Sequence, residues 1–253
     1  MPSPTGLLKW IGRPVKELIE EGYPESVAKR ISSGELSMDP EDVARRMEMG
    51  YDTANPMFHS GDKGLTEIDA SRPFFMSSSP EMSAGYLRKD GEMYKMLIAK
   101  DAKMGEVDAG GLSWGNLEDR PYITATGEVY NTSDFFPTDN PYGPDVTTND
   151  LVKISKQLGE SGLYMDDISD FGPNYPAIRD MFKKTHGKDA RVSELIDEFT
   201  ARNAAINDPT KVRSIKAAFD PEYTGSNILG SRMAPTAAAG LLGILGLTEE
   251  DLK

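Results

Sequence analysis

The sequence contains no cysteine and only two histidines among its 253 residues. Without cysteine the chain cannot form disulfides, use a thiolate nucleophile, or bind zinc or an iron–sulfur cluster through sulfur. Two histidines, His59 and His186, are too few for a metal centre built from several imidazoles. A functional site in this chain therefore has to rely on carboxylates, hydroxyls, aromatic rings and single histidines, and no metal site is expected.

Dense positive charge and long apolar segments are also missing. The 28 Lys and Arg residues are outnumbered by 41 Asp and Glu, which gives a net charge of −13, and the cations form no dense run. Because contacts to nucleic-acid phosphates depend on clustered cations, this argues against nucleic acid as a partner. Residues 233–247 are rich in Ala and Gly and shorter than the roughly 20 residues that span a bilayer, so no stable membrane span is expected.

The first 50 residues have the pattern of two or three helices. Apolar residues recur at helical spacing from Val15 to Ile19. Asp39-Pro40 is typical of a helix start, since Asp favours the N-cap and Pro the first turn, and Gly50 would end that helix. We interpret 1–50 as an N-terminal helical segment.

Short strands and loops are expected from residue 51 onward. The 24 glycines and 17 prolines favour many loops between short elements. Apolar runs bounded by turn residues predict strands at 56–59, 73–76, 92–100 and 162–168. Helical patterning returns at 148–159 and 176–206. This mixture predicts an α+β fold, with a main domain at 51–221, a loop-rich insertion at about 108–150 and a C-terminal tail at 222–253.

A histidine and three aromatic residues are the first candidates for a binding site. His59 lies at a strand end before Ser60 and Gly61, where an imidazole and nearby backbone groups can meet a polar ligand; it can equally serve only to cap the strand. Phe74-Phe75 and Tyr86 offer a flat aromatic wall, on which a planar cation such as nicotinamide gains by stacking. The alternative is that these rings belong to the core.

Two adjacent aspartates are the candidate acids. Asp166 and Asp167 end an apolar strand, and neighbours in a strand point to opposite faces, so only one of them can face a given cleft. A carboxylate in a cleft can stabilise a developing oxocarbenium ion or accept a hydrogen bond from a sugar hydroxyl. The alternative is a solvated strand end.

Taken together and in order, these segments resemble the ADP-ribosyltransferase fold of the diphtheria-toxin and PARP type, most closely its phage and prophage polyvalent-protein versions. Phe58-His59-Ser60-Gly61 matches the family's aromatic-His-Gly-Ser/Thr motif, and Phe74-Phe75 with Ser83-Ala84-Gly85-Tyr86 matches its strand followed by Ser-Ala-x-Tyr. Met93–Ala99 matches the family's next strand, and Gly162–Asp167 its acid-bearing strand. Asn207–Pro221 matches its closing segment. The resemblance spans about residues 40–232, without the insertion. The sequence departs from the family at Ser60, at Phe74, which replaces a Tyr, and at Asn203, the residue nearest the family's late Glu.

The resemblance implies a split β-sheet core and NAD as substrate. His59, with Ser60 and Gly61 beside it, would hold the adenosine ribose and the nicotinamide amide, and Phe74 would line the site. Tyr86 would stack on nicotinamide. Asp167, or Asp166, would be the catalytic acid that holds the nicotinamide ribose and steadies the oxocarbenium ion.

The function implied is phage-associated mono-ADP-ribosylation of a host macromolecule, in the virion or in the host bacterial cytoplasm. Two alternatives stay open. One is a virion or injected structural protein that keeps the fold, has weak or no activity and binds other virion proteins. The other is an NAD glycohydrolase toxin.

Overall fold

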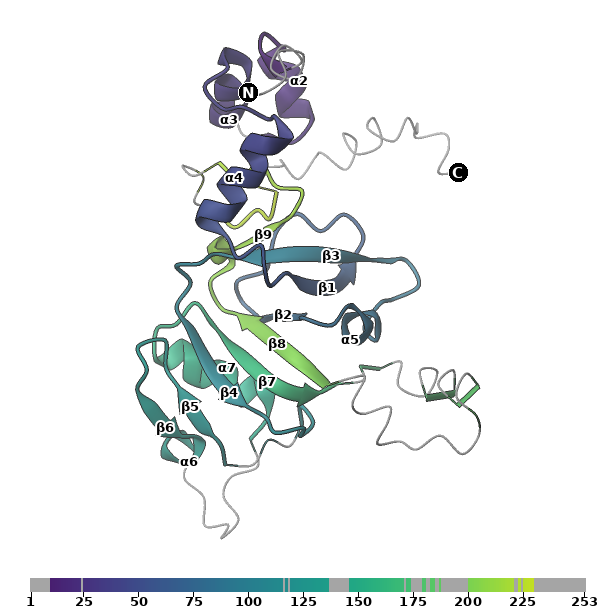
Figure 1. Ribbon diagram of the computed structural model, residues 1–253, viewed down its shortest axis with the longest axis vertical. Helices are drawn as coiled ribbons and strands as arrows, with labels where there is room; N and C mark the ends of the chain where they lie inside the picture. The colour runs from purple at the N-terminus through teal and green to yellow at the C-terminus, as the bar shows by residue number, and fades with distance from the viewer. Residues whose placement is uncertain are drawn as a thin grey trace.

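The computed structural model is an α+β protein built around a nine-strand mixed sheet (Figure 1). It describes residues 10–23, 25–115, 117, 119–136, 146–170, 172–173, 179–180, 183–184, 187, 200–220, 223 and 225–229. Within these ranges the chain forms six α-helices, α2 to α7, and one short 3-10 helix, η1 at Pro209–Lys211. None of the helices in the described ranges is long and apolar enough to cross a membrane.

Three helices precede the sheet, as the sequence predicts. They are α2 (Val15–Glu20), α3 (Glu25–Ser33) and α4 (Pro40–Gly50). Asp39 is the N-cap residue of α4 and Pro40 is its first helical residue, although the Asp39 side chain makes no capping hydrogen bond. Apolar residues of α2 and α3 bury themselves around Ala218, and α4 packs against Phe219, so the N-terminal helices are anchored to the end of the main domain.

The sheet has the strand order β6-β5-β4-β7-β8-β2-β1-β3-β9. Its strands are β1 (Met57–Asp62), β2 (Phe74–Ser77), β3 (Gly91–Ile98), β4 (Met104–Asp108), β5 (Pro121–Ile123), β6 (Val129–Asn131), β7 (Gly162–Ser169), β8 (Thr200–Ile206) and β9 (Val212–Ser214). Only β4 and β7 pair in parallel; all other neighbours are antiparallel. In Figure 1 the strands β4, β7 and β8 run obliquely to the strands β1, β2 and β3, so the strand direction changes between β8 and β2.

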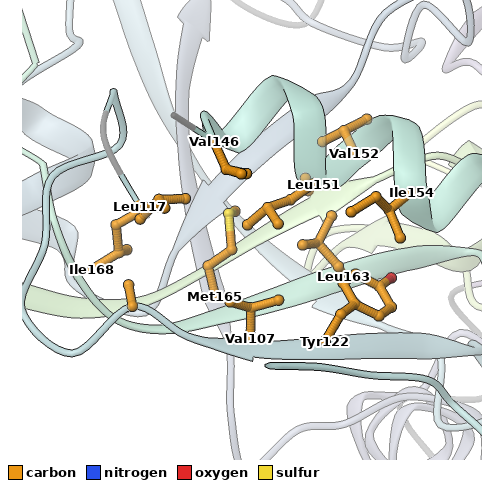
Figure 2. Packing of buried hydrophobic residues seen from close by; sticks show 12 residues of the cluster. Val107, Leu117, Tyr122, Val146, Leu151, Val152, Ile154, Leu163, Met165 and Ile168 are labelled. Atoms are coloured by element: carbon orange, nitrogen blue, oxygen red, sulfur yellow. The ribbon is translucent and has the colours of Figure 1, made fainter. Parts of the chain in front are cut away.

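The two faces of the sheet carry separate apolar cores because side chains alternate along each strand. On one face, Leu151 and Ile154 of α7 (Thr148–Gln157) pack over Leu163 and Met165 of β7 (Figure 2). Residues of the opposite register, such as Ala204 of β8, enter a second cluster on the other face. The start of α7 is fixed by a capping box between Thr147 and Asp150.

Two segments differ from the expectation. Residues 200–206 have helical patterning but form β8, which lies in the middle of the sheet between β2 and β7. The segment 108–150, expected to be loop-rich, contributes β5, β6 and α6 (Thr132–Phe135) to one end of the sheet. Most of the expected tail at 222–253, with the Ala/Gly-rich stretch at 233–247, lies outside the described residues.

Candidate functional site

A cleft opens where β1 and β2 separate. These two antiparallel strands form one residue pair, Phe58 with Ser77. A volume of about 900 Å³ adjoins them, within the range of roughly 300–1,000 Å³ typical of small-molecule sites. Its walls come from β1, β2, the middle of β7 and β8, the residue after β7, the start of α7, and α5 (Pro80–Ala84) with the turn that follows it. The cleft thus collects residues from segments far apart in the sequence.

His59 bridges the gap between the separating strands. Its Nδ1 lies 2.7 Å from the carbonyl oxygen of Phe75, and its ring stacks on the buried ring of Phe74, with 4.0 Å between centroids. A carbonyl can only accept, so Nδ1 carries the proton in this bond. Burial lowers the pKa of His59, which keeps the ring neutral near pH 7. Nε2 is therefore left as a hydrogen-bond acceptor.

Gly61 makes room for this imidazole. A Cβ at position 61 would lie 2.7 Å from His59 Nε2, because residues two apart in a strand point to the same side. Between them, Ser60 points the other way and its hydroxyl lies 3.1 Å from that of Ser83 in α5. The three residues after Phe58 thus have distinct structural roles, and the Ser60–Ser83 contact joins the two motifs that the sequence analysis placed together.

Tyr86 reaches the cleft from the turn after α5. Ser79 caps this short helix by accepting a hydrogen bond from Met82 N, and the chain continues through Gly85 into Tyr86. The Tyr86 hydroxyl donates to Asp170, at 2.6 and 2.7 Å from the two carboxylate oxygens. Burial and the adjacent carboxylate raise the pKa of Tyr86, so the phenol stays protonated as the donor.

Asp170 is the buried carboxylate of the cleft, and the sequence analysis did not select it. It follows directly after β7 and accepts a further hydrogen bond from Gly172 N, at 3.0 Å. Burial raises its pKa, while the two donors favour the ionised form. Gly172 has φ +60, and a Cβ there would lie 2.7 Å from the Gly85 carbonyl oxygen. Only a residue without a side chain permits this close approach next to Tyr86.

Asn203 is a second residue that sequence reasoning did not propose for the site. It lies in β8 between Ser77 and Met165, and all three line the cleft. The residue is 8% exposed and its Oδ1 has no hydrogen-bond partner in the described protein. A buried, unpaired acceptor costs about 1–3 kcal/mol, which a donor on a bound ligand would recover. The available signal was its place nearest to the late Glu of the family that the sequence resembles.

Three aromatic rings are exposed at the cleft: Phe75 at 36%, Tyr86 at 41% and Trp114 at 49%. Phe74, predicted from the sequence to line the site, also borders the cleft, but it is buried beneath His59, because the alternation of β2 turns Phe75 to the other face. Trp114 is positioned through its carbonyl oxygen, which accepts a hydrogen bond from Thr148 N at the start of α7. Exposed rings that share one cleft can stack on planar groups of a ligand.

Asp166 and Asp167 lie elsewhere, so the expectation that one of them shares a cleft with His59 and Tyr86 is wrong. Met165 takes the cleft-facing register, and Asp166 on the opposite face is paired with Arg202. A bulge follows in β7, where Asp167 is exposed with φ +51. The bulge explains why strand alternation alone misplaced it.

Cations line the outer part of the cleft. Arg72, Arg88 and Lys89 are exposed there, in a chain with a net charge of −13. Arg72 pairs with Asp69 at 3.2 Å and Arg88 with Asp62 at 3.6 Å, and both contacts are open to solvent and weak. No group of three metal-binding side chains occurs within the described ranges.

Comparisons with known proteins identified no significant relative of this chain. No protein-family model matches the chain, and neither the curated proteins nor the solved structures gave a significant match.

Proposed function

We propose that the cleft binds NAD and that the protein is a phage-associated NAD-dependent mono-ADP-ribosyltransferase. One observation carries the proposal: three exposed aromatic rings and the Nε2 acceptor of His59 line the same cleft of about 900 Å³. A dinucleotide has two planar rings, two riboses whose hydroxyls donate hydrogen bonds, and a pyrophosphate. The planar rings can stack on the aromatic faces, and a ribose hydroxyl can donate a hydrogen bond to the imidazole acceptor.

The three cationic side chains at the outer part of the cleft suit the pyrophosphate of a dinucleotide. Arg72, Arg88 and Lys89 have exposed side chains, and the salt bridges of the two arginines are at the surface and easily exchanged. Arginine binds phosphate oxygens with charge-assisted hydrogen bonds. In an acidic protein, cations gathered at one cleft favour an anionic ligand there over the rest of the surface.

The family resemblance supports NAD over other dinucleotides. The His motif and the Ser-Ala-x-Tyr motif meet through the Ser60–Ser83 contact, and β1 separates from β2 beside them. In the split-sheet arrangement that we propose, His59 would bind the adenosine ribose and Tyr86 would stack on nicotinamide.

The proposed reaction breaks the bond between nicotinamide and C1′ of its ribose. Nicotinamide leaves with the bonding electrons, a nucleophile of a host macromolecule attacks C1′, and the nucleophile's proton passes to solvent. Positive charge develops on the ribose during this step, and a nearby carboxylate stabilises it. Asp170 takes this role in our proposal in place of Asp166 or Asp167, because it is the buried carboxylate of the cleft.

A second candidate, NAD binding without transfer, is favoured by Asn203. A neutral amide stands on the inner wall of the cleft and cannot stabilise a cation as a carboxylate does. A virion or injected structural protein that keeps the fold would have this property.

Calorimetric titration of the protein with NAD tests the binding proposal. The wild type should bind, and His59→Asn should bind about tenfold more weakly, because Asn keeps a donor for the Phe75 carbonyl but lacks the Nε2 acceptor. Asp166→Asn, on the other face of the sheet, is the matched control and should bind as the wild type does. No heat of binding with the wild type would refute the proposal.

Incubation with adenine-labelled NAD and a host lysate then distinguishes the reactions. Label on a macromolecule, lost in Asp170→Asn, supports transfer. Free labelled ADP-ribose without a labelled acceptor indicates a glycohydrolase. Binding without either product indicates the second candidate and rules out the transferase proposal for that host.

A further inference from the structure

The strand β6 forms a free edge of the sheet. The opposite edge strand, β9, is covered, because Ser214 N donates a hydrogen bond to the carbonyl oxygen of Ile228 at 2.8 Å. In the described part of the chain no strand pairs with the outer side of β6, and Figure 1 shows β6 beside β5 at the end of the sheet. An edge strand without a neighbour presents backbone donors and acceptors to other chains.

The hydrogen bonds between β6 and β5 show which residues of β6 face outward. Just before β6, the carbonyl oxygen of Glu128 accepts a hydrogen bond from Thr124 N at 2.8 Å. Just after β6, Thr132 N donates to the carbonyl oxygen of Arg120 at 3.1 Å. Hydrogen-bonded and non-hydrogen-bonded pairs alternate in an antiparallel ladder, so Tyr130, midway between these two positions, also bonds to β5. The residues on either side of Tyr130 therefore turn their backbone groups toward the free edge.

These outward-facing residues are Val129 and Asn131. The Asn131 N–H is already used, because it donates to the Asp134 carboxylate at 2.9 Å. Val129 is 63% exposed, so its N–H and its carbonyl, both directed outward, can pair with another strand. Val129 is thus the residue of β6 that can exchange two backbone hydrogen bonds with a neighbouring chain.

An exposed apolar pair adjoins this edge. Ile123 lies opposite Val129 in the hairpin and is 40% exposed. Both side chains lie on the sheet face opposite to α7, because Tyr122, which alternates with Ile123, is buried in the cluster that contains the residues of α7. Val129, Tyr130 and Asn131 include neither Pro nor Lys, residues with which natural edge strands prevent further pairing.

We propose that β6 pairs with β6 of a second copy of this chain, antiparallel about a two-fold axis at Val129, so that the two sheets become continuous. In this register Val129 donates to and accepts from Val129 of the partner subunit. The exposed side chains of Val129 and Ile123 from both copies then lie together on one face. A two-fold axis places the same surface on both sides of the contact, and identical copies satisfy both the hydrogen bonds and the apolar contact.

The neighbouring positions select this register. Asn131 lies opposite Gly127 of the partner subunit, whose missing side chain leaves room for the Asp134 carboxylate at the edge. An axis at Tyr130 would instead place the carbonyl of Val129 opposite the Asn131 N–H, which Asp134 already holds. The axis at Val129 therefore leaves fewer backbone groups without a partner.

Charge and position agree with pairing between identical copies. Glu128 lies opposite Tyr130 of the partner subunit, so the two Glu128 carboxylates do not face each other, as directly opposed like charges would be destabilising. Four strands separate β6 from β2, so the cleft stays open in the pair and the contact is independent of the proposed NAD binding. Because the contact is small, we expect a dissociation constant on the order of micromolar or weaker.

Sedimentation equilibrium over roughly 1 to 500 μM, a range that spans this affinity, tests the proposal. The wild type should show a reversible equilibrium between monomer and dimer. Val129→Lys should raise the dissociation constant about tenfold or more, because two ammonium groups would lie directly opposite each other. Met49→Lys makes the same change of charge at a residue of α4 that is 80% exposed, and this matched control should dimerise as the wild type does.

A cross-linking experiment tests the register. The chain has no cysteine, so Val129→Cys introduces a single thiol. The Cα atoms of a hydrogen-bonded antiparallel pair lie about 5.5 Å apart, within the roughly 4.4–6.8 Å that disulfides span. Mild oxidation should therefore convert Val129→Cys into a covalent dimer, whereas Met49→Cys should stay largely monomeric.

Three outcomes overturn the proposal. A wild type that is monomeric across the whole range rules out pairing of identical copies and leaves the edge to a different chain. A dimer that persists in Val129→Lys, or that is weakened equally by Met49→Lys, does not use this edge. A dimer that Val129→Cys fails to cross-link has another register. Should Val129→Lys fail to fold in urea unfolding, the cross-linking comparison decides, and none of these results depends on NAD.

Discussion

The replacement Gly61→Ala tests how the strand sequence builds the site. An added Cβ would lie 2.7 Å from Nε2 and 3.1 Å from Cδ2 of His59. The imidazole has little freedom to move aside, because Nδ1 is bonded to the Phe75 carbonyl and the ring rests on Phe74. The ring must tilt, and in doing so it loses its hydrogen bond, its stacking contact, or both.

The cost follows from these contacts. Overpacking typically destabilises a protein by about 1–3 kcal/mol, and a lost hydrogen bond by about 1 kcal/mol. Replacing a strand glycine by alanine returns roughly 0.5–1 kcal/mol of backbone entropy. We therefore expect Gly61→Ala to lower the free energy of unfolding by about 1–3 kcal/mol and to weaken NAD binding by about tenfold or more, because Nε2 is displaced.

Urea unfolding and calorimetry with NAD measure the two effects. Gly50→Ala is the matched control, since a Cβ at this last residue of α4 meets nothing within 4 Å. The control should be neutral or slightly stabilised, with unchanged binding. If Gly61→Ala unfolds at the wild-type urea concentration and binds NAD as the wild type does, the clamped imidazole is refuted.

Three further predictions concern residues around the cleft. Burial lowers the pKa of folded His59 below its unfolded value of 6.5, so its contribution to stability is complete above pH 6.5, declines below it and is lost as pH falls through the lower folded pKa. The stability difference between pH 7.5 and 5.5, values that bracket roughly the unfolded His pKa, should therefore be smaller in His59→Asn when measured by urea unfolding, and an equal difference would contradict this. Asn203→Leu should leave stability unchanged or raise it by up to about 1 kcal/mol while abolishing NAD binding; a variant that still binds would exclude Asn203 from the site. Asp166→Asn should cost less than about 1 kcal/mol in urea, since its pair with Arg202 is partly exposed, and a larger loss would mean that the pair is structural.

The sequence predicted the elements whose signals are local. The runs at β1, β2, β3 and β7 are apolar and bounded by turn residues, and the structure confirms strands there. β8 was missed because Ala201, Ala204 and Ala205 favour a helix in isolation. Its extended form comes from pairing with strands on both sides, which a local pattern cannot reveal.

The site was predictable only in part for the same reason. His59, Ser60, Gly61 and Tyr86 lie in short motifs, and all four line one cleft. The acid was misplaced because a bulge in β7 interrupts the alternation on which the choice between Asp166 and Asp167 depended.

Asp170 and Asn203 enter the cleft through tertiary contacts. Asp170 is positioned by Tyr86 and the close approach at Gly172, and Asn203 by the placement of β8 next to β2. Neither position stands out in composition or spacing, so a sequence signal was lacking, except that Asn203 is the residue nearest to the late Glu of the family that the sequence resembles.

The fluorescence of Trp114 measures the central claim most directly, because this ring lies exposed at the cleft. The chain has two tryptophans, and Trp10 packs among the N-terminal helices, so Trp10→Phe leaves Trp114 as the sole reporter. The account predicts saturable quenching of this emission by NAD, with the same dissociation constant as calorimetry and weaker binding in Gly61→Ala. Emission that does not change across the titration would contradict NAD binding in this cleft.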